Sequence, residues 1–223
     1  MIKNIVTIQH YTITIFSPEE AAAQPIVYTH FSADAAEAVA QLLAPIPVTL
    51  VAIDGIDWNR QLSPWPATRA FRGEEDFAGE ATLYLKELTE NILPAVEKTL
   101  LIPPTYRAIS GYSMAGLFAV YALYHTDLFA QAASISGSLW YDDFADFLKT
   151  NQPVKVPERI YFSLGDRESA VRNQRLARVG SCTTEAAQIM QELGVKTIFE
   201  WNPGNHFAEV PERMAKGIRW ICQ

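Results

Sequence analysis

YRAISGYSMAGLFAVYALYH, residues 106–125, is the stretch that decides the fold of this 223-residue chain. Its first residues, through Ile109, have the composition of a short buried strand, and the run from Leu117 to Leu123 is apolar and helical. Between them lies GYSMAG, residues 111–116, with small residues two before and two after Ser113. A strand, a sharp turn and a helix form the context of a nucleophile elbow. We therefore predict that Ser113 is a nucleophile at a helix N-terminus, where the helix dipole favours a developing negative charge.

The overall composition is that of a globular protein and argues against several classes of partner. Hydrophobic residues make up 49% of the chain and charged residues 19%, which predicts one folded domain over residues 1–223. The net charge of −7 argues against nucleic acid, because phosphate binding needs a basic face. No apolar run reaches the length of a membrane span, and the N-terminus lacks the apolar centre of a signal peptide. We expect a cytoplasmic protein without a membrane partner, and the composition leaves a homo-oligomer open.

The two cysteines, Cys182 and Cys222, are too few to form a disulfide framework. Neither has the spacing of a metal ligand. We therefore expect isolated thiols and no metal site.

Segments typical of strands and of helices alternate along the chain. Strands are predicted at residues 5–8, 11–16, 26–30, 48–53, 106–109, 130–136, 159–164 and 196–201. Helices are predicted at residues 33–44, closed by Pro45 and Pro47, at 80–100 with a kink or restart at Pro94, and at 117–123, 183–193 and about 211–221. This alternation implies a mostly parallel central sheet with helices on both faces and ligands at the carboxyl ends of the strands. Residues 54–79 lack periodicity, and we expect them to form a long, functional surface loop.

A serine hydroxyl needs a base within hydrogen-bond reach, and histidine is the usual one. The chain contains His10, His30, His125 and His206. His206 follows a predicted strand downstream of Ser113 and near the C-terminus, where the order serine, acid, histidine requires it. We predict that His206 is the base and that His10 and His125 are structural. His30 ends a strand, and we expect it to shape the loop that follows.

The third member of the site should be a carboxylate that fixes the histidine tautomer. Asp166 and Glu168 both follow the predicted strand at residues 159–164, and spacing alone does not choose between them. We favour Glu168, three residues beyond Gly165, and keep Asp166 as the alternative acid.

Two backbone N–H groups should face the oxyanion of the reaction. One belongs to Met114, directly after the nucleophile. The other should come from the loop after the strand at residues 26–30, so from Phe31 or Ser32.

Three segments together resemble a known family. They are GYSMAG at residues 111–116, SGSLW at 136–140 and GNHF at 204–207. They look like the putative esterase (esterase D-like) family of α/β-hydrolases, and within it the branch of siderophore esterases of the enterobactin-hydrolysing type. The resemblance covers nearly the whole chain. It implies an α/β-hydrolase fold and a serine hydrolase that acts on esters without a metal or organic cofactor.

Carried over position by position, the resemblance gives Ser113 as nucleophile and His206 as base. Ala115 stands where the family has glycine. The positions expected to contact substrate are Asn59, Arg60, Trp140 and, beside the nucleophile, Tyr112.

The segment at residues 137–158, where this fold usually carries its lid, is too short for a large helical lid. We therefore expect minimal or no lid. An open, shallow site should be bordered by Trp58, Trp65, Trp140 and Tyr141. Such a site suits a small-molecule or polymer-attached ester, siderophore-like or sugar-linked, better than a lipid droplet.

The leading hypothesis is a carboxylic-ester hydrolase with a serine–histidine–acid triad and an acyl-enzyme intermediate. A thioesterase or acyltransferase of the same fold is the first alternative, because the sequence does not separate the acceptors. A catalytically inactive binding protein is the second. A peptidase is disfavoured, because peptidases of this fold generally add a cap or a second domain.

Overall fold

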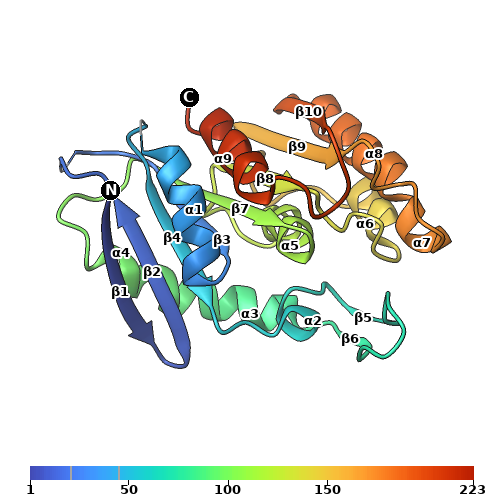
Figure 1. The fold of residues 1–223 in the computed structure, drawn as a ribbon, viewed down its shortest axis with the longest axis horizontal. Helices are drawn as coiled ribbons and strands as arrows, with labels where there is room; N and C mark the ends of the chain where they lie inside the picture. The colour runs from blue at the N-terminus through green and yellow to red at the C-terminus, as the bar shows by residue number, and fades with distance from the viewer. Residues whose placement is uncertain (21, 45) are drawn as a thin grey trace.

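An eight-stranded, mostly parallel sheet forms the centre of the computed structural model, which describes residues 1–20, 22–44 and 46–223 (Figure 1). The strands lie in the order β1-β2-β4-β3-β7-β8-β9-β10. The pairs β1–β2 and β2–β4 are antiparallel, and all other neighbours are parallel. Their bounds are β1 Ile2–Ile8, β2 Tyr11–Ser17, β3 Ile26–His30, β4 Thr49–Asp54, β7 Arg107–Tyr112, β8 Gln131–Ile135, β9 Arg159–Gly165 and β10 Lys196–Asn202.

Helices cover both faces of this sheet (Figure 1). Helices α1 (Ala33–Leu43) and α9 (Val210–Ile221) pack against each other on one face. The opposite face carries α3 (Ala81–Glu87), α4 (Leu93–Glu97), α5 (Met114–Leu123) and α8 (Val179–Glu192). The α/β-hydrolase fold predicted from the sequence is confirmed.

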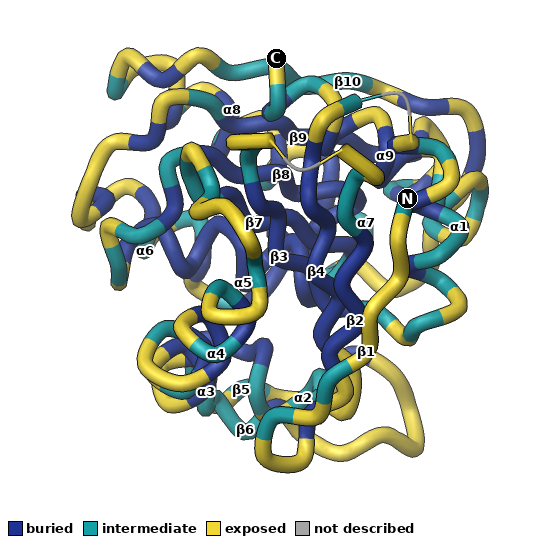
Figure 2. Tube along the Cα trace, turned by 90° about the vertical axis from the view of Figure 1, so that its left-hand side faces the viewer, coloured by how far each residue is buried: buried dark blue, intermediate teal, exposed yellow. Residues whose placement is uncertain are grey.

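The strands alternate their side chains between two buried cores, as parallel strands covered on both faces must. In β4, Val51 and Ile53 join the core under α3, α4, α5 and α8, whereas Leu50 and Ala52 join the core under α1 and α9. Figure 2 shows the central strands buried and the edge strand β1 largely exposed. The sheet interior is therefore a rigid support for the loops at its carboxyl edge.

Several predicted elements have different bounds. The helix predicted over residues 80–100 is α3, a π-helical turn (Leu88–Ile92) and α4, because Pro94 has no N–H to donate to the carbonyl four residues earlier. Helix α8 begins at Val179, four residues before the prediction, and buries that side chain in the core. Helix α1 ends at Leu43, and Pro45, its predicted stop, lies outside the described residues.

The loop at residues 54–79 has more structure than its sequence indicates. It contains a single helical turn, α2 (Trp58–Gln61), and a hairpin of β5 (Pro66–Ala67) and β6 (Phe77–Ala78). In the predicted lid segment, α6 (Phe144–Thr150) packs against α8. Across the described ranges, no helix combines the length and apolar character needed to cross a membrane.

Candidate active site

Ser113 lies in the turn between β7 and α5 with φ 57° and ψ −123°, a strained backbone conformation for a residue with a side chain. The turn is tight. A Cβ added to Gly111 would lie 2.1 Å from the carbonyl oxygen of Ala115, and one added to Gly116 would lie 2.9 Å from the Cα of Gly137. Both positions therefore need glycine. The local sequence forms the strand, turn and helix of a nucleophile elbow.

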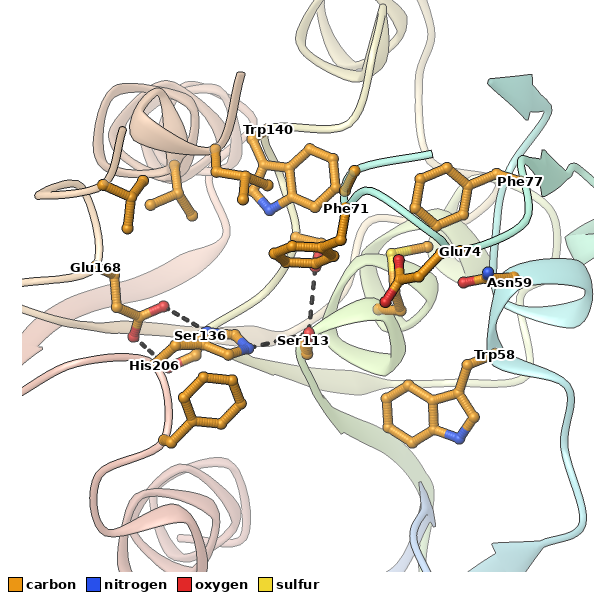
Figure 3. A pocket seen from close by; sticks show the side chains of 17 residues that line it. Trp58, Asn59, Phe71, Glu74, Phe77, Ser113, Ser136, Trp140, Glu168 and His206 are labelled. Carbon is orange, nitrogen blue, oxygen red and sulfur yellow. Dashed lines mark hydrogen bonds and ion pairs between the residues drawn. The ribbon is translucent and has the colours of Figure 1, made fainter. Parts of the chain in front are cut away.

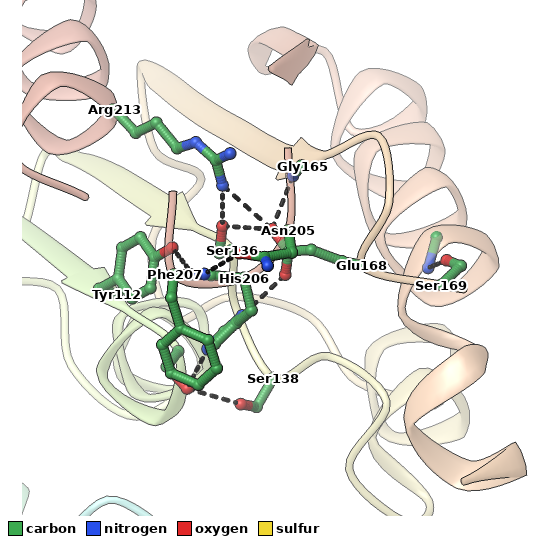
Figure 4. A network of polar contacts seen from close by, with 12 residues as sticks. Tyr112, Ser136, Ser138, Gly165, Glu168, Ser169, Asn205, His206, Phe207 and Arg213 are labelled. Carbon is green, nitrogen blue, oxygen red and sulfur yellow. Dashed lines mark hydrogen bonds and ion pairs between the residues drawn. The ribbon is translucent and has the colours of Figure 1, made fainter. Parts of the chain in front are cut away.

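His206 and Glu168 come together beside this serine (Figures 3 and 4). The Nε2 atom of His206 lies 3.1 Å from Ser113 Oγ, and its Nδ1 atom lies 2.7 Å from Glu168 Oε2. His206 follows β10 and Glu168 follows β9, so the two residues meet at the carboxyl edge of the sheet. The imidazole ring therefore bridges the serine hydroxyl and a carboxylate.

The Glu168 carboxylate is buried and fully hydrogen-bonded (Figure 4). Its Oε1 atom accepts hydrogen bonds from the Ser136 hydroxyl at 2.7 Å, the Gly165 N–H at 2.6 Å and Arg213 Nη1 at 3.3 Å. Burial raises the pKa of Glu168, but the hydrogen bonds from His206, Ser136 and Gly165 outweigh burial and leave the pKa below its usual value. The carboxylate is thus kept ionised with Oε2 facing the histidine.

Asp166, the alternative acid, points elsewhere. Its Oδ1 accepts a hydrogen bond from the Gly204 N–H at 2.9 Å, and its side chain is 57% exposed. Arg167 is its nearest cation, at 3.9 Å. In this geometry Glu168, and not Asp166, contacts His206.

A pocket of about 370 Å³ opens beside the Ser113 hydroxyl. Its aromatic lining consists of Trp58, Phe71, Phe77, Trp140 and Phe207. Figure 3 shows the first four of these side chains in the same pocket as the serine and the histidine. Its aliphatic lining consists of Ala70, Val171, Leu176 and Val179. Much of this lining comes from the loop at residues 54–79. The pocket is therefore predominantly apolar next to the reactive groups.

The four positions expected to contact substrate have different locations. Trp140 and Asn59 line the pocket. Arg60 instead forms an ion pair with Glu80 on the surface. Tyr112 donates its hydroxyl to the backbone carbonyl of His206 and so supports the loop that carries the base. Neither Arg60 nor Tyr112 is among the described residues that line the pocket.

The expected oxyanion donors lie at the same edge of the sheet. Met114 lines the pocket, and its N–H begins helix α5, so this N–H has no partner within the helix. Phe31 and Ser32 directly follow β3, and Ser32 caps α1. The pocket lining, as far as the structure describes it, does not include these two residues.

Two of the four predicted border residues are wrong. Trp65 donates its Nε1–H to the carbonyl of Asp142 at 3.0 Å, and the Tyr141 hydroxyl donates back to the carbonyl of Trp65 at 2.5 Å. Their rings pack together with Phe144 in a core cluster. They anchor the loop at residues 54–79 and do not face the pocket.

The residues that the sequence analysis missed are mainly the ones behind the site. Ser136 has a φ of 47° at the end of β8 and bonds Glu168. Arg213 is buried in the first turn of α9. The sequence could have indicated this burial, because Arg213 lies next to Met214 and four residues before Gly217, on the apolar face of the predicted helix. Phe71 carried no comparable pattern, since it lies in an irregular loop.

Comparisons with known proteins agree with this geometry. The family model described as "Putative esterase" matches residues 25–206. This chain belongs to the putative esterase family. The matched range begins just before β3 and ends at His206, so it spans the elbow and all three residues of the hydrogen-bonded chain.

Among relatives of this esterase-family chain, the uncharacterized protein YbbA of Bacillus subtilis (strain 168) is 26% identical over 150 residues. That match covers 66% of this chain and 60% of YbbA, so it spans less than two thirds of that protein.

Two solved structures show the same fold. An IroE-like serine hydrolase from Shewanella oneidensis superposes with a TM-score of 0.83 at 18% identity, over 99% of this chain and 80% of that one. The siderophore hydrolase EstA from Aspergillus nidulans superposes with a TM-score of 0.75 at 16% identity, over 95% and 89%. At these identities the likeness shows the fold alone.

Proposed function

We propose that this protein is a serine hydrolase that cleaves carboxylic esters through an acyl-enzyme intermediate. The observation that carries the proposal is the continuous hydrogen-bonded chain from Ser113 through His206 to Glu168, with distances of 3.1 Å and 2.7 Å. Membership of the esterase family supports it, as does the likeness to a serine hydrolase and a siderophore hydrolase.

In the proposed reaction, Ser113 Oγ attacks the ester carbonyl carbon while His206 Nε2 takes the hydroxyl proton. Glu168 accepts the hydrogen bond of His206 Nδ1–H, which keeps Nε2 free to receive that proton. When the C–O bond of the ester breaks, His206 returns the proton to the leaving alcohol. Water then hydrolyses the acyl-enzyme by the same proton transfers, which regenerates the free serine.

The negative charge that develops on the carbonyl oxygen needs donors above the elbow. The Met114 N–H is the first, at the positive end of α5. The second comes from Phe31 or Ser32. The pairing of Tyr28 with Ile109 in β3 and β7 supports this, since it brings the ends of both strands to one point of the sheet edge.

The pocket supports an ester with an apolar or aromatic group on one side of the scissile bond. Its walls are aromatic and aliphatic, and Glu74 is the charged lining residue outside the triad. Among the described lining residues none is Lys or Arg, so an anionic group would enter without a counter-ion. Phe207 at the mouth is 82% exposed, which leaves space for a bulky or polymer-attached remainder of the substrate.

The test is hydrolysis of short-chain p-nitrophenyl esters by the wild type, Ser113→Ala and Ser110→Ala. Ser110 is a buried serine on β7, three residues before Ser113, and its hydroxyl has no partner in the described structure, so Ser110→Ala is a matched control. Ester turnover that survives in Ser110→Ala and is lost in Ser113→Ala supports the proposal. Equal turnover in wild type and Ser113→Ala contradicts it.

If the wild type does not hydrolyse these esters, labelling with a fluorophosphonate probe distinguishes an enzyme of narrow substrate specificity from an inactive binding protein. Labelling that requires Ser113 supports a reactive serine. A parallel series of thioesters with the same acyl groups distinguishes a thioesterase from an oxygen-ester hydrolase.

A further inference from the structure

Arg213 is a buried cation directly behind the proposed catalytic acid (Figure 4). Its side chain is 1% exposed and that of Glu168 is 3% exposed. The Nη1 atom lies 3.3 Å from Glu168 Oε1 and 3.4 Å from the Ser136 hydroxyl. Within the described residues, Glu168 is the one carboxylate that forms an ion pair with Arg213. A buried charge is costly without such a partner, so the pair depends on both members.

We infer that Arg213 is a positioning residue, which acts through Glu168 to hold the acid and the base of the active site in register. The inference rests on the proposed function. It assigns to Arg213 no contact with substrate or with the reacting atoms.

The two ends of the Glu168 carboxylate have separate partners. Oε1 accepts from Ser136, Gly165 and Arg213, whereas Oε2 accepts from His206. The three donors on Oε1 fix the rotation of the carboxylate plane. As a result, Oε2 stays directed at His206 Nδ1.

Arg213 also joins the loop that carries the base. Its Nη2 atom donates to the carbonyl of Pro203 at 2.8 Å, three residues before His206. A Cβ added to Gly165 would lie 2.4 Å from the Gly204 oxygen and 3.1 Å from Arg213 Nη1. The guanidinium therefore lies in close contact with both the loop after β9 and the loop after β10. Its planar fork suits this double contact, which a lysine ammonium does not reproduce.

The charge of Arg213 has a measurable consequence for the neighbouring histidine. A cation near the Glu168–His206 pair disfavours any additional proton on the pair. Removing that cation therefore favours protonation, and the pair should take up its proton at higher pH. The acid side of the rate profile should move in the same direction, because a protonated His206 does not act as a base.

The other titratable groups around the Glu168–His206 pair do not account for a change in its proton uptake near neutral pH. Burial raises the pKa of Tyr112 on β7 and of Tyr161 on β9, so both rings stay neutral there. Glu200 on β10 accepts a hydrogen bond from the Tyr161 hydroxyl and pairs with Lys216 on α9. Asp166 bonds the Gly204 N–H on the other side of the loop.

The experiment compares wild type, Arg213→Met, Arg213→Lys and a control, Arg219→Met. Arg219 lies on the exposed side of the same helix, so the control makes the same chemical change away from the triad. The first readout is the NMR signal of the His206 Nδ1–H proton, which reports its hydrogen bond to Glu168 and does not require turnover. The second is kcat, KM and the pH profile of ester hydrolysis, with thermal unfolding as a check on folding.

For Arg213→Met we expect the NMR signal of the His206 Nδ1–H proton to move from its wild-type position, because its hydrogen bond to Glu168 loses alignment, and the acid side of the rate profile to move to higher pH. We expect kcat to fall about 10- to 100-fold with KM nearly unchanged, because the acid and base lose their alignment. Arg213→Lys should keep the pH profile close to wild type while kcat still falls. Arg219→Met removes a hydrogen bond to the carbonyl of Leu42 but no contact with the triad, so it should match wild type in the NMR signal, kcat and KM. A folded Arg213→Met protein with wild-type kcat overturns the inference.

If Arg213→Met does not fold, Arg213→Lys decides. If Arg213→Lys has wild-type kcat, the guanidinium group of Arg213 is not needed to position Glu168 and His206, and the inference is overturned. A lowered kcat at unchanged KM and unchanged thermal stability supports the inference. If the wild type hydrolyses no ester, the proposed function fails, whereas the NMR signal of His206 Nδ1–H still tests the effect of Arg213 on the hydrogen bond to Glu168.

Discussion

Exchanging each candidate carboxylate for its amide separates the roles of Glu168 and Asp166. In Glu168→Gln the amide oxygen can replace Oε1 and keep the hydrogen bonds from Ser136 and Gly165. The amide NH₂ then faces His206 Nδ1 at the former Oε2 position, 2.7 Å away. Two donors cannot pair, so the ring must carry its proton on Nε2. That tautomer cannot accept the proton of Ser113.

The expected size of the loss follows from these contacts. A wrong histidine tautomer costs roughly 10³- to 10⁴-fold in kcat in triad enzymes. Asp166→Asn keeps an oxygen for the Gly204 N–H, and its side chain is largely exposed, so its effect on stability stays within about 0.5 kcal/mol. Because Asp166 does not contact His206, kcat of Asp166→Asn should stay within about twofold of wild type. The two variants should therefore differ by roughly a thousandfold.

Glu168→Gln has a second consequence, because it leaves the Arg213 charge without a carboxylate. Breaking a buried ion pair costs about 3–5 kcal/mol, so this variant should also unfold at lower denaturant concentration than Asp166→Asn. The assay is kcat with a p-nitrophenyl ester at a temperature where circular dichroism shows both variants folded. Equal losses in the two variants, or a folded Glu168→Gln with more than about a tenth of wild-type kcat, would refute the assignment of the acid.

Two further predictions concern the core and the pocket. His30 is fully buried, its Nε2 lies 3.0 Å from the Tyr84 hydroxyl, and burial lowers its pKa to about 3. A histidine in the unfolded chain has a pKa near 6.5, so below that pH the unfolded state binds a proton that the folded state does not bind until about pH 3. Between pH 7 and pH 4.5 the free energy of unfolding of wild type should therefore fall by about 2–3 kcal/mol more than that of His30→Gln, as measured by urea unfolding. Equal losses in the two proteins would contradict this. Phe71 is 54% exposed at the pocket, so Phe71→Ala should raise KM for aromatic esters about fivefold with little effect on acetate esters, since an aromatic contact contributes about 1 kcal/mol. Leu83→Ala, an exposed apolar residue on α3, is the control in the same assay, and an equal rise in KM for both ester types would count against an aromatic contact at Phe71.

The parts of the fold that follow local rules could be predicted from the sequence. The buried strands around β4 and β7 are short apolar runs, and the elbow is set by Gly111 and the helix that follows it, so both were visible without tertiary information. The order of serine, acid and histidine along the chain likewise restricted the base to His206. Glycine, strand and helix signals act over a few residues, which is why they can be read from sequence.

The walls of the pocket depend on contacts between distant segments and could not be read in the same way. Trp65 and Trp140 are both large aromatic residues, yet Trp65 bonds the carbonyl of Asp142 and Trp140 lines the pocket beneath Arg175. The residues next to Trp65 and Trp140 in the sequence do not indicate which of the two side chains lines the pocket. Arg60 was expected at the substrate, but Glu80, twenty residues later, holds it on the surface.

The turn in which Asp166 and Glu168 lie favours Glu168 as the proposed acid, and its geometry explains why spacing alone left the choice open. Asp166 still continues the parallel pairing of β9 with β10, because its N–H donates to the carbonyl of Asn202 at 2.8 Å. Its side chain accordingly bonds the Gly204 N–H beside the ladder. The chain then reverses, and the N–H of Glu168 donates to the carbonyl of Gly165 at 3.1 Å. This turn returns position 168 to the sheet edge, where a glutamate is long enough to accept the Gly165 N–H with one oxygen and reach His206 with the other. The proposed acid is therefore the residue that the turn brings back to the sheet, whereas Asp166, the carboxylate nearer to the strand, accepts a hydrogen bond from the backbone of the adjacent loop.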